Sequence, residues 1–327
     1  MAFGTIGTGI NSPTAALVGT MNAITEKYIY PVIADNTFKP SIAFWAMQRK
    51  GKKFGRGELI YPAMYQENLA GGAYYGTQVL TPQVVDTVQP LDQLWRPYYQ
   101  NISIPVTDIV LNRNSAMDIV NTKWIEATGS LLQKLSRALF GVSPQNTTLD
   151  IDNIDAWVYQ STNTIAGINR ATASNSWFLA QTAVNASSAA LTPALANQGF
   201  WSAGQFGYDT PDIFMLTPAS YGGFMNNFTQ YNRFTNNIQE VEAIQAGFRS
   251  HFLFNTALVF PDPFVPSGKA YMMNSNYIFP VWHKDDYFVT DPFIQPSNQR
   301  VLISNLYVTW QLSCISPRMN VAFYNVA

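Results

Sequence analysis

The sequence is poor in charged side chains and nearly devoid of cysteine and histidine. Asp, Glu, Lys and Arg make up 12% of its 327 residues, roughly half the ~25% of an ordinary soluble domain. The single cysteine, Cys314, excludes a disulfide framework or a cysteine metal cluster within one chain. The two histidines, His251 and His283, show no ligand spacing typical of zinc sites. No apolar run of about 18 residues occurs, so no membrane span is predicted.

Motifs of catalysis are also missing. No G-x-S-x-G elbow is present, and the glycine-rich residues 4–9 lack both a preceding strand and the Gly-Lys-Ser/Thr ending of a phosphate loop. Asp285 and Asp286 are adjacent, which suits a solvated turn better than an acid–base pair. The net charge of −1 excludes the strongly basic class of nucleic-acid binders. We therefore expect neither an enzyme nor a bound cofactor.

Aromatic side chains are abundant, at 14% of residues. Interface cores are depleted in Lys, Glu and Asp and enriched in Tyr, Phe and Met. Sparse charge with abundant aromatics therefore favours a chain whose surfaces meet other copies of itself. An ordinary β-rich domain is the alternative.

Residues 58–95 predict a long hairpin that contains no Lys or Arg. Pro82 and Pro90 suit edge strands or exposed loops rather than a central strand. The predicted tip, residues 68–76, holds three glycines and two adjacent tyrosines. Such a projection needs another surface to cover it, so we predict an inter-subunit contact there, made by Leu69, Gly71, Gly72, Tyr74 and Tyr75.

A basic run precedes the hairpin. It comprises Arg49, Lys50, Lys52, Lys53 and Arg56. These cations suit ion pairs across a subunit boundary, nonspecific contact with nucleic-acid phosphates, or a solvated loop. Base-level recognition is not predicted, because Phe54 is the only aromatic residue among them.

Residues 114–140 predict a long helix, preceded by a strand over 98–111. An apolar stripe recurs at spacings of three and four, and its core is predicted to be Met117, Val120, Trp124, Leu131 and Leu135. Ser115 with Asp118 resembles a capping box, and Gly141 supplies a stop. About 25 residues at 1.5 Å each give a rod of roughly 37 Å.

The remaining elements are shorter. Pro13 is predicted to open an amphipathic helix within an extended arm, and residues 145–210 suggest loop, with a short helix as an alternative. Helices are predicted at 219–227 and 238–248, and strands at 212–216, 257–260, 269–273, 277–282, 287–289 and 301–314. Period two places Cys314 on the apolar face of the last strand, which favours a small buried hydrophobe over a reactive thiol.

This order of parts resembles the major capsid proteins of tailed double-stranded DNA bacteriophages, which share the Hong Kong 97-type capsid fold. Residues 163–168 resemble the entry to that family's axial domain, 211–221 its strand and Pro-capped helix, and 320–323 its final strand. The resemblance implies an α+β fold with an N-terminal arm, an extended β-hairpin loop, a long spine helix, and peripheral and axial domains.

Carried onto this chain, the resemblance implies an arm at 1–45 and an extended loop at 50–96. It implies a peripheral domain with the spine helix at 97–160 and 285–327, and an axial domain at 161–284. The subunit would assemble with itself, as hexamers and pentamers, into an icosahedral shell around phage DNA. Its other partners would be a portal, a decoration protein and a separate scaffold protein, or no scaffold at all, with no membrane. Its place would be the virion capsid, assembled in the host cytoplasm.

Two departures from the family qualify this expectation. Some members cross-link their shells covalently through an isopeptide bond from a loop lysine, but residues 58–95 contain no lysine. Some members carry a long scaffolding segment before the loop, for which this sequence has too few residues. An encapsulin-like cellular compartment is the alternative function, and an enzyme of another fold is a more distant one.

Overall fold

The computed structural model describes residues 41–55, 57–80, 83–111, 119–142, 149–159, 161–184, 190–205, 209–228 and 252–326. The predictions for the arm before residue 41, the Ser115/Asp118 cap and the helix at 238–248 lie outside these residues. So do Arg56, Pro82, Met117 and His251. Two compact units divide the chain: Met1–Phe38, Gln100–Ser130 and Thr290–Leu306 form one, and Lys39–Tyr99, Leu131–Val289 and Tyr307–Ala327 form the larger one.

A six-stranded sheet carries the core of the larger unit. Its order is β7-β14-β11-β8-β10-β9, and its strands are β7 (Gln181–Val184), β8 (Ile213–Leu216), β9 (Phe252–Phe254), β10 (Ala257–Pro261), β11 (Gly268–Met273) and β14 (Val321–Val326). The strands predicted at 212–216, 257–260 and 269–273 are confirmed. All four residues of β8 are buried, as expected of a continuous apolar run in the middle of a sheet.

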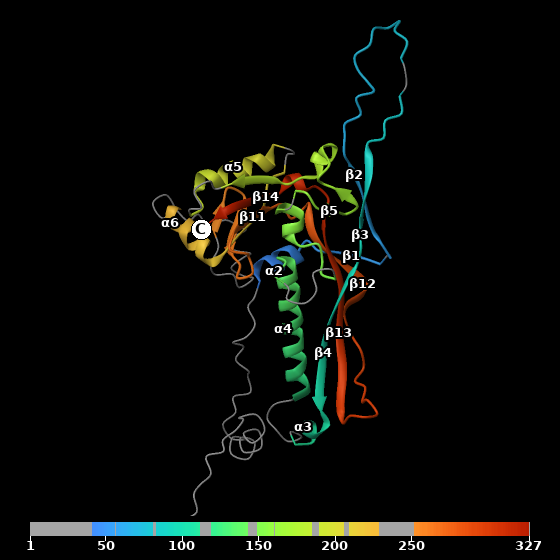
Figure 1. The fold of residues 1–327 in the computed structure, drawn as a ribbon, viewed down its shortest axis with the longest axis vertical. Helices are drawn as coiled ribbons and strands as arrows, with labels where there is room; N and C mark the ends of the chain where they lie inside the picture. The colour runs from blue at the N-terminus through green and yellow to red at the C-terminus, as the bar shows by residue number, and fades with distance from the viewer. Residues whose placement is uncertain are drawn as a thin grey trace, which may run out of the picture. The chain divides into compact units, whose positions relative to one another are not determined.

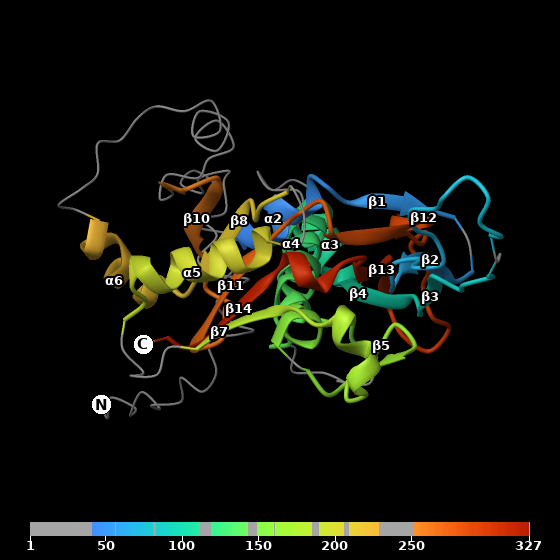
Figure 2. The ribbon, with the colours of Figure 1, turned by 90° about the horizontal axis from the view of Figure 1, so that it is seen from above.

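Two helices pack against this sheet, α5 (Pro193–Gly204) and α6 (Pro218–Phe228). Figure 2 shows α5 running alongside β7 and β14. Gly199 on α5 lies so close to the Phe323 ring on β14 that a Cβ atom there would collide with it. The helix predicted at 219–227 is confirmed as α6.

The prediction of loop with a short helix over 145–210 was incomplete, because the described residues there also form short strands and two further helical turns. The structure places there the π-helix η1 (Asp155–Tyr159), the 3-10 helix η2 (Ala173–Phe178), strands β5 (Thr164–Ile165) and β6 (Ile168–Asn169), β7, and the 12-residue α5. The start of α5 has a physical cause, since the Thr192 hydroxyl accepts from the Leu195 N–H at 3.3 Å and Pro193 follows it.

A four-stranded sheet has the order β1-β12-β13-β4, with β1 at Lys52–Phe54, β12 at Ile278–Thr290, β13 at Val301–Cys314 and β4 at Arg96–Pro105. β13 confirms the strand predicted at 301–314. The two strands predicted at 277–282 and 287–289 are one strand, so the turn expected at Asp285–Asp286 was wrong. The Thr309 hydroxyl on β13 donates a hydrogen bond to the Asp286 carboxylate, so the Asp286 side chain has a partner within the sheet.

The predicted strand 98–111 is a strand followed by a helix. β4 ends at Pro105 and α3 spans Val106–Leu111, because proline cannot donate to a ladder. In the smaller unit, Ile102 and Ile104 of β4 pack with Ala127 of α4 (Ile119–Leu139). Trp124 lies against this cluster with its ring centroid 6.1 Å from that of Phe293.

The predicted stop at Gly141 is confirmed. Gly141 adopts φ +69°, its N–H donates to Ala138 O at 3.0 Å, and the Val142 N–H donates to Arg137 O at 3.0 Å. This pair of bonds is a Schellman motif, which satisfies the last carbonyls of a helix.

The short helix α2 (Ile42–Gln48) is fixed to the larger unit by a buried carboxylate. Asp262, fully buried, accepts from the Ser41 hydroxyl at 2.7 Å and from the Ala43 N–H at 3.1 Å. Phe44 and Met47 are buried beside it. Residues 41–45, predicted as the end of an extended arm, are therefore docked as the start of a helix.

Candidate assembly surface

The predicted hairpin is present, and its base is anchored. β2 (Leu59–Met64) and β3 (Val88–Gln93) pair antiparallel with Pro62 opposite Pro90. Leu59 is buried with Phe279 and Val281. Gln93 is buried, donates from Nε2 to Leu312 O at 3.0 Å, and accepts from the Ser313 hydroxyl. Side-chain bonds to the central strand β13 therefore fix the base of the hairpin.

The loop beyond these strands is exposed. It spans residues 65–87 and carries no assigned strand among its described residues, so it is longer than the tip predicted at 68–76. Figure 1 shows it extending past the ends of β2 and β3. Leu69 and Tyr75 are each 80% exposed and Tyr74 is 65% exposed. A Cβ atom added at Gly71 or Gly72 would meet no atom within 4 Å beyond the adjacent residues. The tip thus contacts little of its own chain.

The basic run is partly a strand at a sheet edge. Lys52 and Lys53 lie in β1, which pairs in parallel with β12. Lys52 Nζ lies 4.0 Å from the centre of the Phe279 ring, and Lys53 Nζ lies 3.6 Å from that of Tyr287. Both lysines remain exposed. Cation–π contact holds each ammonium in place without removing it from solvent.

Arg49 and Lys50, the other described cations of the run, are also exposed. The Arg49 guanidinium lies 5.3 Å from the centre of the Trp45 ring. Lys50 Nζ lies 3.5 Å from Asn276 Oδ1. Residues 52–54 therefore form an edge strand rather than a loop, and the described cations of the run stay accessible.

The spine residues divide between the two compact units. Leu131 and Leu135 are fully buried in the larger unit, whereas Val120 and Trp124 are half-buried in the smaller one. The predicted stripe is therefore present over the described part of the helix, with its deepest positions toward the C-terminal end.

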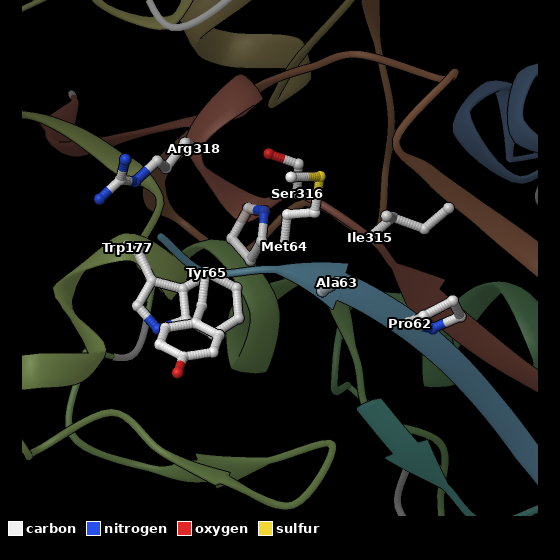
Figure 3. Close-up of a pocket in the computed structure, with 9 residues that line it drawn as sticks. Pro62, Ala63, Met64, Tyr65, Trp177, Ile315, Ser316 and Arg318 are labelled. Atoms are coloured by element: carbon white, nitrogen blue, oxygen red, sulfur yellow. The ribbon is translucent and has the colours of Figure 1, made fainter. Parts of the chain in front are cut away.

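A pocket lies beside the hairpin base (Figure 3). Its volume is about 300 Å³, and it is lined by Pro62, Ala63, Met64, Tyr65, Trp177 and residues 315–318. The last of these lead into the 3-10 helix η3 (Pro317–Met319). The Tyr65 and Trp177 ring centroids are 6.1 Å apart. The sequence did not point to this pocket, since its walls come from three segments far apart along the chain.

Candidate metal ligands do not cluster in the described residues. No group of three or more His, Cys, Asp or Glu side chains there is arranged to hold a metal ion. His283 packs against the Trp95 ring, with centroids 5.1 Å apart. Within the same residues, no helix is long and apolar enough to cross a membrane.

Solved structures identify the fold. The chain matches a subunit of the cyanophage A-1(L) capsid with a TM-score of 0.73 at 13% identity, covering 91% of this chain and 96% of that one. The Hong Kong 97-type capsid fold is present. A native GTA particle capsid matches at TM-score 0.58 and 10% identity, over 97% and 100% of the two chains. The holo-SrpI encapsulin of Synechococcus elongatus matches at 0.57 and 12%, over 94% and 95%. No family model and no curated protein matches the sequence.

Within this capsid fold, the α+β class, the extended hairpin loop and the long helix are those the sequence resemblance implied. The β2–β3 hairpin with residues 65–87 corresponds to the extended loop, and α4 to the spine helix. The final strand β14 pairs with β7 and β11. It therefore belongs to the same sheet as β8 and β10, whereas the sequence division grouped it with 285–327.

Proposed function

We propose that this protein is the structural subunit of an icosahedral shell that encloses phage double-stranded DNA. The observation that carries the proposal is the match to the cyanophage capsid subunit over nearly the whole of both chains. The exposed, cation-free loop supports it, because such a surface is covered only by a partner.

The proposed division of the chain is the one that the resemblance implies. It has an arm at 1–45, an extended loop at 50–96, an axial domain at 161–284, and a peripheral domain with the spine helix at 97–160 and 285–327. The pairing of β14 with β7 and β11 supports assigning that strand to the axial domain instead. We propose inter-subunit contacts at Leu69, Gly71, Gly72, Tyr74 and Tyr75, and ion pairs or DNA contact at Arg49, Lys50, Lys52, Lys53 and Arg56.

The partners proposed are further copies of the chain, as hexamers and pentamers, with a separate scaffold protein, a portal and packaged DNA. A structure of phage G major capsid proteins with decoration proteins is among the matches, which supports adding a decoration protein. The shell would assemble in the host cytoplasm, and the subunit itself would catalyse no reaction.

Electron microscopy and light scattering of the expressed protein test this function. Closed particles of uniform size are expected. A protein that remains monomeric with its phage scaffold present would contradict the proposal.

The encapsulin match makes a cellular compartment the second candidate. Particles purified from infected cells and treated with nuclease separate the two. Protected genome-length DNA inside supports the phage shell, whereas a co-purifying enzyme without DNA supports a compartment.

A further inference from the structure

One short segment, residues 163–178, holds the extended hairpin at two points, and we call this segment the bracket. Near the base of the β2–β3 ladder, the Asp92 N–H donates to Ala166 O in the β5–β6 turn at 3.1 Å. Just past the other end, the Tyr65 ring lies beside the Trp177 ring of η2, with centroids 6.1 Å apart (Figure 3). About five strand steps, roughly 17 Å, separate the two contacts along the ladder. A single contact would act as a pivot, whereas two separated contacts fix a direction.

Tyr65 joins the two arms of the hairpin at the point where Trp177 touches it. Its N–H donates to Thr87 O at 3.0 Å, and its hydroxyl donates to Asp86 O at 2.7 Å. The ring that meets Trp177 therefore belongs to one arm and is bonded to the other. Holding Tyr65 in place holds the distal end of the ladder as a unit.

A buried cation, Arg170, fixes the bracket to η1. Its guanidinium donates to Ala156 O at 2.8 Å and to Trp157 O at 2.9 Å, a pairing that suits the planar fork of arginine. Its backbone N–H donates to Asn163 O at 3.1 Å, and its guanidinium carbon lies 5.3 Å from the centre of the Phe178 ring. Arg170 thus contacts both ends of the bracket and ties them to η1.

η1 is in turn fixed to the six-stranded sheet. The Asp155 carboxylate accepts from Lys269 Nζ on β11 at 2.5 Å and from the Tyr271 hydroxyl on the same strand. The Tyr159 ring stacks on the Tyr324 ring of β14 with centroids 4.1 Å apart, and the Tyr324 hydroxyl donates to Tyr159 O at 2.7 Å. A continuous series of contacts therefore leads from the hairpin through the bracket to this sheet.

The bracket carries backbone strain where it meets the hairpin. Ala166 has φ +50° and Gly167 has φ +79°, both in the left-handed region, as in a type I′ turn. Asn, Asp or Gly is the usual residue at the first of these positions, and alanine is not. Such strain persists only where the surroundings fix the backbone. Here the strained residue is the one whose carbonyl accepts from Asp92.

We infer that Arg170 and Trp177 are positioning residues for assembly, which hold the extended hairpin in one direction relative to the six-stranded sheet before it meets another subunit. This inference rests on the proposed shell. The anchors at Leu59 and Gln93 lie at the hairpin base, and Trp177 adds a hold at the distal end of the ladder. A direction fixed in advance lowers the ordering cost of association. A hairpin that held this direction only a tenth of the time would bind about tenfold more weakly.

Pulsed electron spin resonance on free subunits tests the positioning. Val88→Cys at the distal end of β3 and Ala194→Cys on α5, both at exposed positions, carry the spin labels. The unmodified bracket should give a narrow distribution of distances between them. Trp177→Ala should broaden this distribution, because it frees the distal end of the ladder. Trp177→Phe keeps a ring at this half-buried position and should leave the distribution narrow.

Arg170→Lys tests the other positioning residue. An ammonium group has no planar fork to reach two carbonyls, so this variant should also broaden the distribution. Tyr99→Ala, which truncates an exposed ring on β4, is the matched control and should not. Far-UV circular dichroism reports the fold of each variant, and if Arg170→Lys fails to fold, the two Trp177 variants decide the outcome.

Assembly kinetics give a second readout that folding alone would not change. Folded Trp177→Ala should associate with an apparent affinity about tenfold lower, and adding Tyr65→Ala should weaken it no further, since both changes remove one contact. An unchanged distance distribution or unchanged assembly in folded Trp177→Ala would overturn the inference and leave the proposed shell standing. Unmodified subunits with a narrow distribution that never form particles would overturn the proposed shell, and with it the role in assembly.

Discussion

Gly141 combines two constraints at the end of α4. Its φ of +69° lies in the left-handed region, and a Cβ atom there would collide with the Asn153 side chain. Gly141→Ala should therefore lower the free energy of unfolding by about 1–3 kcal/mol. Urea denaturation measures this change.

Gly222→Ala is the matched control. Gly222 lies inside α6, is exposed, and has open space around a Cβ. Alanine should raise stability there by about 0.5–1 kcal/mol. Equal effects of the two substitutions would refute the account of Gly141.

The spine positions should rank by burial. Leu131 is fully buried, so Leu131→Ala should cost about 2–5 kcal/mol. Trp124 is half-buried and makes an edge contact with Phe293, so Trp124→Ala should fall below the ~3–5 kcal/mol of a fully buried ring. Thermal unfolding of both variants gives the order, and a larger loss at Trp124 would contradict it.

Cys314 should be unreactive in the folded protein. Burial raises the pKa of its thiol to about 12, against a smaller lowering by the positive charge of Arg170. Only the thiolate is nucleophilic, so alkylation at about pH 8 should require unfolding, where the pKa returns to ~8.5. Because the folded pKa is the higher one, the thiol's contribution to stability is complete below about pH 8.5 and is lost as the pH rises toward 12. Mass spectrometry after iodoacetamide treatment checks this, and rapid native labelling would disprove it.

Among the elements, strands and helices with a clean apolar period could be predicted from the sequence. The alternation along β13 and the continuous apolar run of β8 each predicted a strand, and the structure has a strand at both places. β12 was divided in two because Asp285 and Asp286 suggested a turn, and nothing in the sequence shows that Thr309 meets Asp286. Thr192 followed by Pro193 was a usable helix signal within the Ala- and Asn-rich stretch, and it indicates the start of α5.

The candidate site was predictable only where it is local in sequence. The hairpin and its exposed tyrosines follow from composition and turn residues. The positions of Lys52 over Phe279 and of Trp177 beside Tyr65 depend on segments more than a hundred residues apart. Contacts between such distant segments are set by the topology of the fold, which cannot be predicted from a single sequence by local patterns.

The loop tip should matter for assembly and not for folding. Tyr74→Ser with Tyr75→Ser removes two exposed rings that contact little of their own chain, so the melting temperature of the subunit should stay unchanged. Assembly should weaken strongly, since aromatic anchors dominate interface energies. Particle yield by sedimentation together with calorimetry of the subunit checks both parts. Full particle yield would show that the tip is not part of an inter-subunit interface.

At the scale of the whole molecule, the shell should be held together without covalent links. Residues 58–95 offer no amine for an isopeptide bond, and Cys314 is buried. Each contact is weak alone, because a surface ion pair contributes about 0–1 kcal/mol, but it recurs at every symmetry-related position.

Boiled in detergent and reductant, mature particles should therefore release one band near 36.5 kDa. A ladder of multimers would contradict this expectation. It would direct attention to Lys50, Lys52 and Lys53 at the base of the loop.

The absence of Lys and Arg from the extended loop also decides which proteases can cut it. The first basic residue after the hairpin is Arg96, which precedes Pro97, so trypsin-like enzymes find no ready site between Gly57 and Arg113. An unassembled subunit can thus expose this loop and still resist nicking by proteases that cut after basic residues. Chymotrypsin-like enzymes, which cut after aromatic side chains, would find Tyr74 and Tyr75 in free subunits and lose them in the shell.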